Sequence, residues 1–314
     1  MGHLPINRTW FYRLSGALIE SDIPLPSRPG SPPHHDDGRP IALRLAPVVG
    51  GEPRPPGSWQ SHDHGSVNKT PDGFLLHLVA GADFWIARDG TAVVCSPSDA
   101  CGTEAVAQLF VDQVLPLVLH VRGQFAFHGS SVAFAGHELV GFLGRSGAGK
   151  STLASSFARD ASALLFSDDC LAVEVAGADI RAHPSYASTR LWSESAGALF
   201  ADRGALPLAS PRTDKLRAML PVAREPLPLR RLYLLTPTDG KPAVTRLSRR
   251  DALVELTAHL YRLDPEDRVR LAGELDLLEK VVSRVPVARL AYRHAYAELP
   301  AVRAAIVGDL KPPG

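Results

Sequence analysis

The chain has few cysteines and almost no net charge. Its three cysteines, Cys95, Cys101 and Cys170, are an odd number without metal-ligand spacing, so the sequence predicts reduced thiols in a cytoplasmic protein. The formal net charge of +1 excludes a global field that would recruit nucleic acid or an anionic membrane. We therefore expect no nucleic-acid partner and no membrane partner.

Long apolar segments and an export signal are also lacking. The longest apolar run near the middle of the chain, Val114–Leu119, is far shorter than a bilayer span. The N-terminus lacks a cationic segment followed by an apolar one, so we expect no export. Hydrophobic residues make up 45% and charged residues 21%, which is typical of a globular chain with one large domain or two ordinary ones.

One of only six lysines lies in a glycine-rich motif that fits the pattern Gly, any four residues, Gly-Lys-Ser/Thr. The motif runs Gly144, Arg145, Ser146, Gly147, Ala148, Gly149, Lys150, Ser151. Glycines permit left-handed backbone and close approach, so successive N–H groups can converge on phosphate oxygens. Lys150 would reach the β- and γ-phosphates, and the Ser151 hydroxyl would complete a Mg²⁺ shell. The motif, together with Thr152, predicts a P-loop that binds nucleotide phosphates.

The flanking sequence agrees with a P-loop better than with an accidental glycine-rich turn. The apolar run Glu138–Leu143 precedes the motif, as a buried strand should. The residues after it, 151–159, predict an amphipathic helix whose positive N-terminal end would face the anion. The preceding run Phe125–Phe134 predicts an antiparallel neighbour that brings His128 close to the nucleotide, although a core histidine is the alternative.

A second candidate feature is the acid pair Asp168-Asp169, which ends the apolar run 163–167. If this strand runs beside the P-loop strand, both carboxylates reach the phosphate edge of the sheet. A buried acid pair needs cations, and Mg²⁺ would supply them. The alternative is a solvated turn. We assign Asp168 as the base that accepts a proton from the attacking hydroxyl and Asp169 as the metal ligand; the exchanged assignment is nearly as good. Neighbouring side chains on a regular strand point to opposite faces, so both acids can serve only if the strand ends or bulges there.

The rest of the chain predicts an α/β protein with two domains. Residues 1–105 form a small β-rich domain, and residues 106–314 form the domain with the motif. A histidine cluster in the first part has irregular spacing and no cysteine, so we interpret it as solvated loop rather than metal site. Its members are His34, His35, His62 and His64. A helix is predicted from Thr103 to about Val121, kinked or ended near Pro116.

Beyond the acid pair, the sequence predicts a hairpin, a loop, further strands and helices. The hairpin covers 170–175 and 180–183, the loop 184–192, the strands 230–235, 243–247 and 287–292, and the helices 193–200, 248–261, 266–283 and from Pro300 onward. Residues 212–250 hold ten Lys or Arg against three acids. Arg190, Lys215 and Arg217 are candidates for phosphate contacts, with ordinary surface charge as the alternative.

Three features in close order resemble the catalytic core of HPr kinase/phosphorylase: His128-Gly129, the glycine-rich motif, and Ser167-Asp168-Asp169. The chain is more closely similar to HPr-kinase-related proteins encoded beside maturation genes of lasso-type ribosomal peptides, in which a Leu-Trp pair like Leu191-Trp192 follows the core. The matching stretch runs from about Phe125 to Trp192. Residues before about 100 carry no specific match.

The resemblance implies a P-loop kinase core, a mixed sheet flanked by helices, that uses ATP and Mg²⁺ to phosphorylate a serine hydroxyl. The acceptor would be a peptide or protein, for example a lasso-peptide precursor. Lys150 and Ser151 would be the phosphate and metal ligands, Asp168 and Asp169 the acid/base and metal-binding pair, and His128 the site histidine. The Glu-Ile-Arg-Gly-like signature of HPr kinases is missing. The resemblance therefore leaves open whether HPr is the substrate, whether the reverse phosphorolysis occurs and whether the protein forms hexamers or another homo-oligomer.

Two other functions fit the same residues. A small-molecule or carboxykinase-like phosphotransferase would share the P-loop core but would need a compact polar pocket for a metabolite. A nucleotide-gated binding protein with weak ATPase activity would use the N-terminal domain for docking. Phosphopeptide analysis separates the first interpretation from these two.

Overall fold

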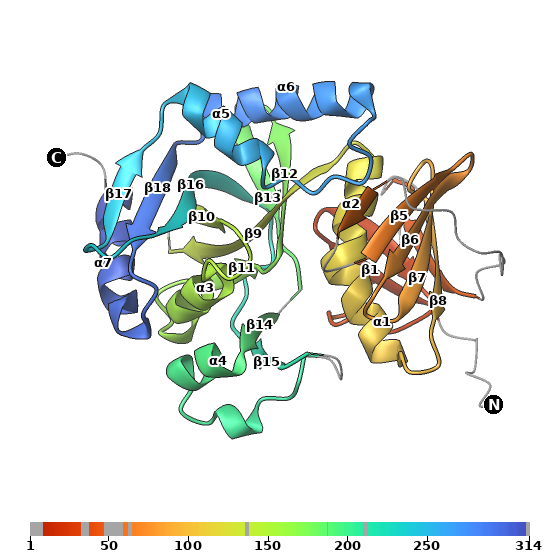
Figure 1. The fold of residues 1–314 in the computed structure, drawn as a ribbon, viewed down its shortest axis with the longest axis horizontal. Coiled ribbons are helices and arrows are strands. Elements are labelled where there is room, and N and C mark those ends of the chain that lie inside the picture. Colours follow the sequence, from red (N-terminus) through yellow and green to blue (C-terminus); the bar gives the residue numbers. More distant parts are fainter. Residues whose placement is uncertain are drawn as a thin grey trace. The chain divides into compact units, whose positions relative to one another are not determined.

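The computed structural model describes residues 9–32, 38–46, 59–61, 65–135, 138–186, 188–209 and 213–311. The fold is mixed α/β, as the sequence predicts, and it consists of two compact units (Figure 1). Described residues up to Gln124 belong to the first unit and those from Phe125 onward to the second. The predicted boundary at residue 105 falls inside the first unit, which includes the helical segment after Thr103. The histidine cluster lies outside the described residues.

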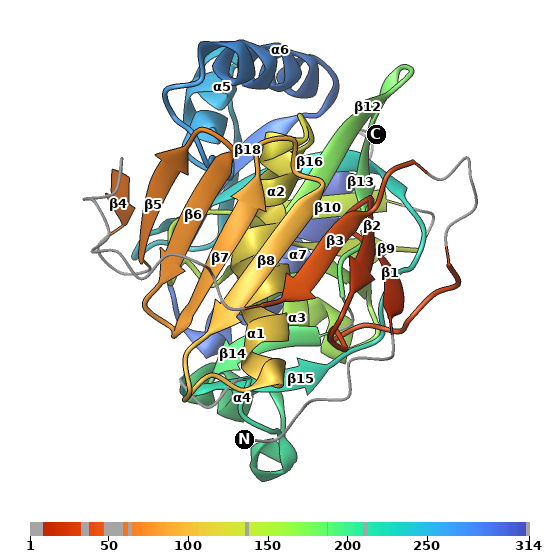
Figure 2. The same ribbon diagram turned by 90° about the vertical axis from the view of Figure 1, so that its right-hand side faces the viewer.

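The first unit is built on one eight-stranded sheet in the order β1-β2-β3-β8-β7-β6-β5-β4 (Figure 2). Its strands are β1 Trp10–Leu14, β2 Ala17–Ser21, β3 Ile41–Leu45, β4 Trp59–Ser61, β5 Gly65–Thr70, β6 Gly73–Leu78, β7 Ala82–Ala87 and β8 Ala92–Pro97. β1 and β2 form a hairpin, because Ser15 and Gly16 between them both have positive φ and reverse the chain.

A helical segment of the first unit runs along one face of this sheet (Figures 1 and 2). It comprises α1 Thr103–Leu109, the π-helical η1 Phe110–Val114 and α2 Leu115–Val121. The π-turn ends just before Pro116, which lacks the N–H that a regular helix would use, so the predicted irregularity takes this form. By length and composition alone Thr103–Val121 could cross a membrane, but 89% of it is buried, as in a core helix.

The second unit is organised around a mixed sheet whose two longest strands, β9 and β16, each pair with three other strands. Its strands are β9 Phe125–Phe134, β10 Glu138–Leu143, β11 Leu164–Ser167, β12 Cys170–Ala176, β13 Asp179–His183, β16 Leu227–Pro237, β17 Ala243–Arg246 and β18 Val287–Tyr292. β9 pairs with β10 and also with β11 and β12, while β16 pairs with β10, β13 and β18. These pairings close a ring through β9, β10, β16, β13 and β12.

The surroundings of β10 agree with the prediction only in part. β9 is its antiparallel neighbour, with Val132 opposite Val140, as predicted. The expected arrangement of β11 beside β10 is wrong, because β9 lies between them and pairs with both. The parallel neighbour of β10 is instead β16, which is also parallel to β18. The carboxyl ends of β10, β16 and β18 therefore meet at one edge of the sheet.

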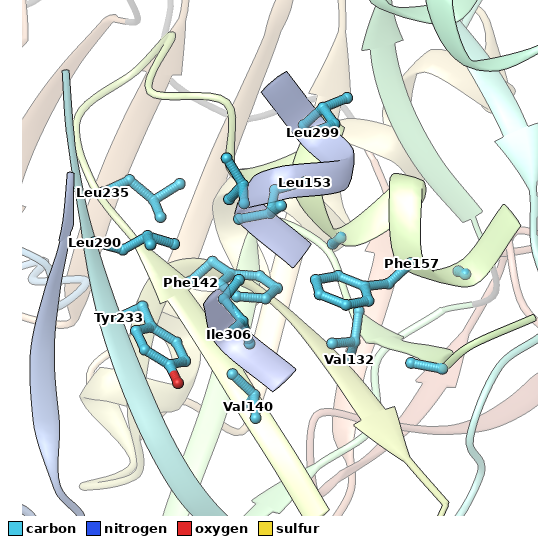
Figure 3. Packing of buried hydrophobic residues seen from close by; sticks show 14 of the residues in the cluster. Val132, Val140, Phe142, Leu153, Phe157, Tyr233, Leu235, Leu290, Leu299 and Ile306 are labelled. Atoms are coloured by element: carbon cyan, nitrogen blue, oxygen red, sulfur yellow. The ribbon is translucent and has the colours of Figure 1, made fainter. Parts of the chain in front are cut away.

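Helices cover both faces of this sheet, because strand residues alternate between two cores. Phe142 of β10 and Tyr233 of β16 pack with α3 Lys150–Arg159 and α7 Leu299–Leu310 (Figure 3). The rings of Phe142 and Phe157 are stacked at a centroid distance of 6.2 Å. Leu143 and Leu232 instead face the core beneath α5 Arg249–Thr257 and α6 Arg268–Arg284. The result is a sheet between two helical layers.

The segment after β13 differs from its prediction. Residues 184–192 were expected to form a loop, but Ser188–Trp192 is strand β14, which pairs with β15 Lys215–Met219. β14 leads directly into α4 Ser193–Leu199. Ser248 is the N-cap of α5, since its side chain accepts a hydrogen bond from the Asp251 N–H at 3.1 Å.

Candidate functional site

The glycine-rich loop joins β10 to α3 by a tight turn with left-handed backbone. Gly144, Gly147 and Gly149 have φ values of +157°, +78° and +85°. A Cβ on Gly149 would lie 2.9 Å from the Tyr292 hydroxyl, so a side chain there would collide as well as strain the backbone. The loop brings the first turn of α3, with its unpaired N–H groups, to the same edge of the sheet as the ends of β16 and β18.

Lys150, at the start of α3, folds back over this loop. Its ammonium group donates hydrogen bonds to the carbonyl oxygens of Gly144 at 2.9 Å and Arg145 at 3.1 Å. Burial lowers the pKa of Lys150, while the charges of Asp169 and Asp168 act in the opposite direction. The lysine is therefore close to both acids and is held by backbone groups that a phosphate can replace.

Asp168 is the centre of the hydrogen-bond network. It is 1% exposed and accepts four hydrogen bonds from three parts of the chain. The donors are the hydroxyls of Ser130 at 2.6 Å, Ser151 at 2.8 Å and Thr189 at 2.7 Å, and the N–H of Arg190 at 3.1 Å. The bond from Ser151 joins the glycine-rich loop to the acid pair.

Asp169 is held in a different way. It has a left-handed backbone, with φ of +62°, and its carboxylate forms an ion pair with Arg190. Burial is the largest single influence on Asp169 and would raise its pKa. The charge and the hydrogen bond of Arg190, together with other nearby positive groups such as Lys215, outweigh burial and lower the pKa to about 2. Asp169 is therefore ionised at neutral pH, and its negative charge is paired with the Arg190 guanidinium.

The two carboxylates can both reach the site because the strand breaks between β11 and β12. Both strands pair antiparallel with β9, and a bulge at Phe166 shifts the register before the acids. Gly129 lies opposite this break, and its N–H donates to the Asp169 carbonyl at 3.2 Å. A Cβ on Gly129 would lie 2.8 Å from the Phe142 carbonyl oxygen, so glycine is needed where β9 passes the end of β10.

His128 lies next to Gly129 and is linked to Asp169 through Tyr261. The Tyr261 hydroxyl donates to the Asp169 carbonyl at 3.0 Å and lies 2.8 Å from His128 Nδ1. Tyr261 donates its only hydroxyl proton to the Asp169 carbonyl, so its oxygen can only accept a hydrogen bond from His128. His128 Nδ1 must therefore carry the hydrogen and Nε2 the lone pair. Burial and the charge of Lys150 lower the pKa of His128, so the ring is neutral at neutral pH.

The three predicted cations all belong to the β14–β15 pair. Arg190 bonds Asp169, and Arg217, its cross-strand partner, donates to the Ala209 carbonyl at 2.8 Å. The Lys215 ammonium lies 5.1 Å from the centroid of the Trp192 ring. The charge of Lys215 acts on both Lys150 and Asp169, so it lies near the site.

Sequence reasoning missed four side chains that hold the site together: Ser130, Thr189, Tyr261 and Tyr292. Only Ser130 could have been found from the local sequence, since it directly follows His128-Gly129 in the predicted strand Phe125–Phe134. Thr189 lies in a segment predicted as loop, and Tyr261 follows α5, far from the motif in sequence. Their roles depend on tertiary contacts that a local pattern does not contain.

The donor set fits a Mg²⁺ ion that is bound together with a nucleotide. Among the described residues, no group of three or more His, Cys, Asp or Glu side chains could hold a metal ion by itself, without ligands from a bound substrate. Mg²⁺ is usually held by one or two carboxylates and by substrate phosphates, with water completing the shell. The Ser151 hydroxyl and the Asp168 carboxylate lie side by side next to the glycine-rich loop. Together with the phosphates of a bound nucleotide they would supply such a set of ligands.

Comparison with known proteins finds no matching family model and no matching curated protein. Among solved structures, the HPr(Ser) kinase/phosphatase from Coxiella burnetii aligns with 59% of this chain and 95% of its own chain. The sequence identity is 9% and the TM-score is 0.32. Similarity of this size does not assign a function, so the function has to be inferred from the contacts of the site.

Proposed function

We propose that this protein is an ATP- and Mg²⁺-dependent phosphotransferase that transfers the γ-phosphate of ATP to a hydroxyl group. The hydrogen bond between Ser151 and Asp168 is the observation that carries this proposal. It joins the loop that would bind the phosphates to an acid pair on a different element. A glycine-rich turn without a ligand would not need a buried carboxylate there.

The glycine-rich loop and Lys150 would hold the triphosphate. Phosphoryl transfer depends mainly on positioning and on neutralising charge around the transferred group. The loop N–H groups and the Lys150 ammonium supply positive charge once Lys150 leaves the carbonyls of Gly144 and Arg145. A bound Mg²⁺ ion would neutralise the β- and γ-phosphate oxygens.

The hydrogen bonds favour the exchanged assignment of the two acids. Asp168, bonded to Ser151, would share Mg²⁺ with that hydroxyl. Asp169 would then face the acceptor and take the proton of its hydroxyl. Its low pKa makes it a weak base while Arg190 is bound to it. If Arg190 turns to the transferred phosphate, the pKa of Asp169 rises as the acceptor loses its proton.

A serine of a peptide or protein is the acceptor that the family resemblance of residues 125–192 supports. His128 and Tyr261 would act by holding the backbone of Asp169, to which Tyr261 donates its hydrogen bond. The serine oxygen forms a bond to the γ-phosphorus of ATP, the bond between that phosphorus and the β–γ bridging oxygen breaks, and the products are phosphoserine and ADP. Asp169 would receive the proton that the hydroxyl loses.

The test combines nucleotide titration with transfer of labelled phosphate from γ-labelled ATP to candidate serine peptides. Wild type should bind ATP only weakly without Mg²⁺ and should phosphorylate an acceptor peptide. Lys150→Ala should lose ATP binding, and Asp168→Asn should lose most transfer. Transfer of the label to a metabolite instead of a peptide would show that the acceptor is a small molecule. Absence of ATP binding by the wild type would overturn the proposal.

A further inference from the structure

We infer that the end of β18 and the residues that follow it, 292–296, form the nucleoside-binding part of the site, with the rings of His294 and Tyr296 beside the base. The inference rests on the proposed function, because it places the remaining part of the same nucleotide. The ligand is the aromatic base of a nucleoside triphosphate.

The position of the segment in the sheet is the first argument. β18 runs parallel to β16, and β16 runs parallel to β10. The residues that follow β18 therefore emerge at the edge where the glycine-rich loop follows β10. In open α/β sheets, ligands lie beyond the carboxyl ends of the parallel strands.

Two tyrosines attach this segment to the phosphate-binding elements. The buried Tyr292 hydroxyl donates to the Ala148 carbonyl in the loop at 3.3 Å. The Tyr296 hydroxyl lies 3.1 Å from Ser195 Oγ, which accepts a hydrogen bond from Thr152 at 3.2 Å. The segment is thus held beside the first turn of α3 at both of its ends.

The direction of the triphosphate follows from the same contacts. Ser151 points to Asp168, which marks the end where transfer takes place. Thr152 lies about 100° further around the helix and points to Ser195 and Tyr296 instead. A triphosphate that has its γ-phosphate near Asp168 therefore leaves the loop toward Thr152, and its nucleoside reaches the segment after β18.

The chemistry of the exposed side chains fits a base. Tyr296 is 36% exposed, although its hydroxyl is anchored, so part of its ring is available to a ligand. His294 is exposed, and its ring centroid lies 5.1 Å from that of Tyr292. Stacking on an aromatic side chain holds any base without requiring hydrogen bonds to its edge.

The test compares ATP with inorganic tripolyphosphate, which has the phosphates but no nucleoside. Binding of each ligand with Mg²⁺ is measured by calorimetry for wild type, His294→Ala, Tyr296→Leu and Lys150→Ala. Tyr296→Leu should weaken ATP binding about 10-fold, in the range found when a stacking ring is removed, and should leave tripolyphosphate binding within about twofold. Tyr296→Phe, which keeps the ring, should lose much less ATP affinity than Tyr296→Leu. Val269→Ala, an exposed change on α6, is the surface control.

The outcomes separate this inference from the proposed function. Equal ATP affinity in wild type, His294→Ala and Tyr296→Leu would overturn the inference, and so would equal losses for both ligands. Lys150→Ala should lose both ligands whether or not the nucleoside position is correct. A wild type that binds neither ligand would overturn the proposed function and the inference with it. Thermal unfolding of each variant verifies that the fold is retained.

Discussion

At the scale of single residues, Asp168 determines whether the site exists. Its carboxylate is bonded to β9 through Ser130, to α3 through Ser151 and to β14 through Thr189. A buried carboxylate with four donors is stable because each lone pair has a partner. The same residue thus contributes both to the fold and to the proposed chemistry.

Asp168→Asn should therefore reduce stability as well as activity. The amide group would place a donor against at least one hydroxyl or N–H donor in a buried site. We expect the free energy of unfolding to fall by about 2–4 kcal/mol, measured by urea denaturation. Thr189→Val removes a single donor and should cost about 1–2 kcal/mol. Equal stability of Asp168→Asn and wild type would show that the network described here does not form.

The Asp169–Arg190 pair predicts a dependence of stability on pH. The pKa of Asp169 is lowered from 3.8 to about 2 in the folded protein. The pair therefore stabilises the fold above about pH 4, and this contribution is lost as the pH falls through about 2. The difference in unfolding free energy between wild type and Arg190→Gln should shrink over this window. A difference that stays constant from pH 5 to pH 2 would contradict the ion pair.

At the scale of elements, the glycine-rich loop is shaped by backbone strain that only glycine avoids. Gly147 and Gly149 have similar positive φ values, but their surroundings differ. A Cβ on Gly147 has no atom within 4 Å, whereas one on Gly149 meets the Tyr292 hydroxyl. The two positions therefore separate the cost of the left-handed backbone from the cost of a collision.

Gly147→Ala should destabilise the protein by about 1 kcal/mol, the usual cost of a left-handed alanine. Gly149→Ala should cost more and should also weaken ATP binding, because the loop or Tyr292 has to move. Adding Tyr292→Phe to Gly149→Ala should recover part of the loss, since the colliding oxygen is removed. Chemical denaturation and ATP titration measure both effects. Identical losses for the two single alanine variants would contradict this description of the loop.

The elements also show which features a sequence can reveal. β9, β10 and β18 have the predicted bounds or nearly so, because each is an apolar run that ends at a turn or glycine. The pairing of β11 with β9 instead of β10 could not be predicted, because partner choice depends on contacts far apart in sequence. β14 was missed for the same reason: its residues are ordered by Asp168 and by β15.

At the scale of the whole molecule, the proposed site is formed entirely by the second unit. The loop, the acid pair, Arg190 and Tyr261 all lie after Phe125. This unit also contains two hydrophobic cores, one on each face of its sheet. Its length is within the usual range of independently folding domains. Nucleotide binding should therefore require none of the first unit.

Residues 125–314 expressed alone should unfold cooperatively and should bind ATP within about threefold of the full chain, because differences below about 0.7 kcal/mol are expected for an intact site. The full chain and its Lys150→Ala variant serve as controls. If the first unit positions the acceptor, the fragment should keep ATP binding but should phosphorylate a peptide with a higher KM. A fragment that folds but does not bind ATP would show that residues before 125 belong to the site, and the placement of the function in the second unit would be wrong.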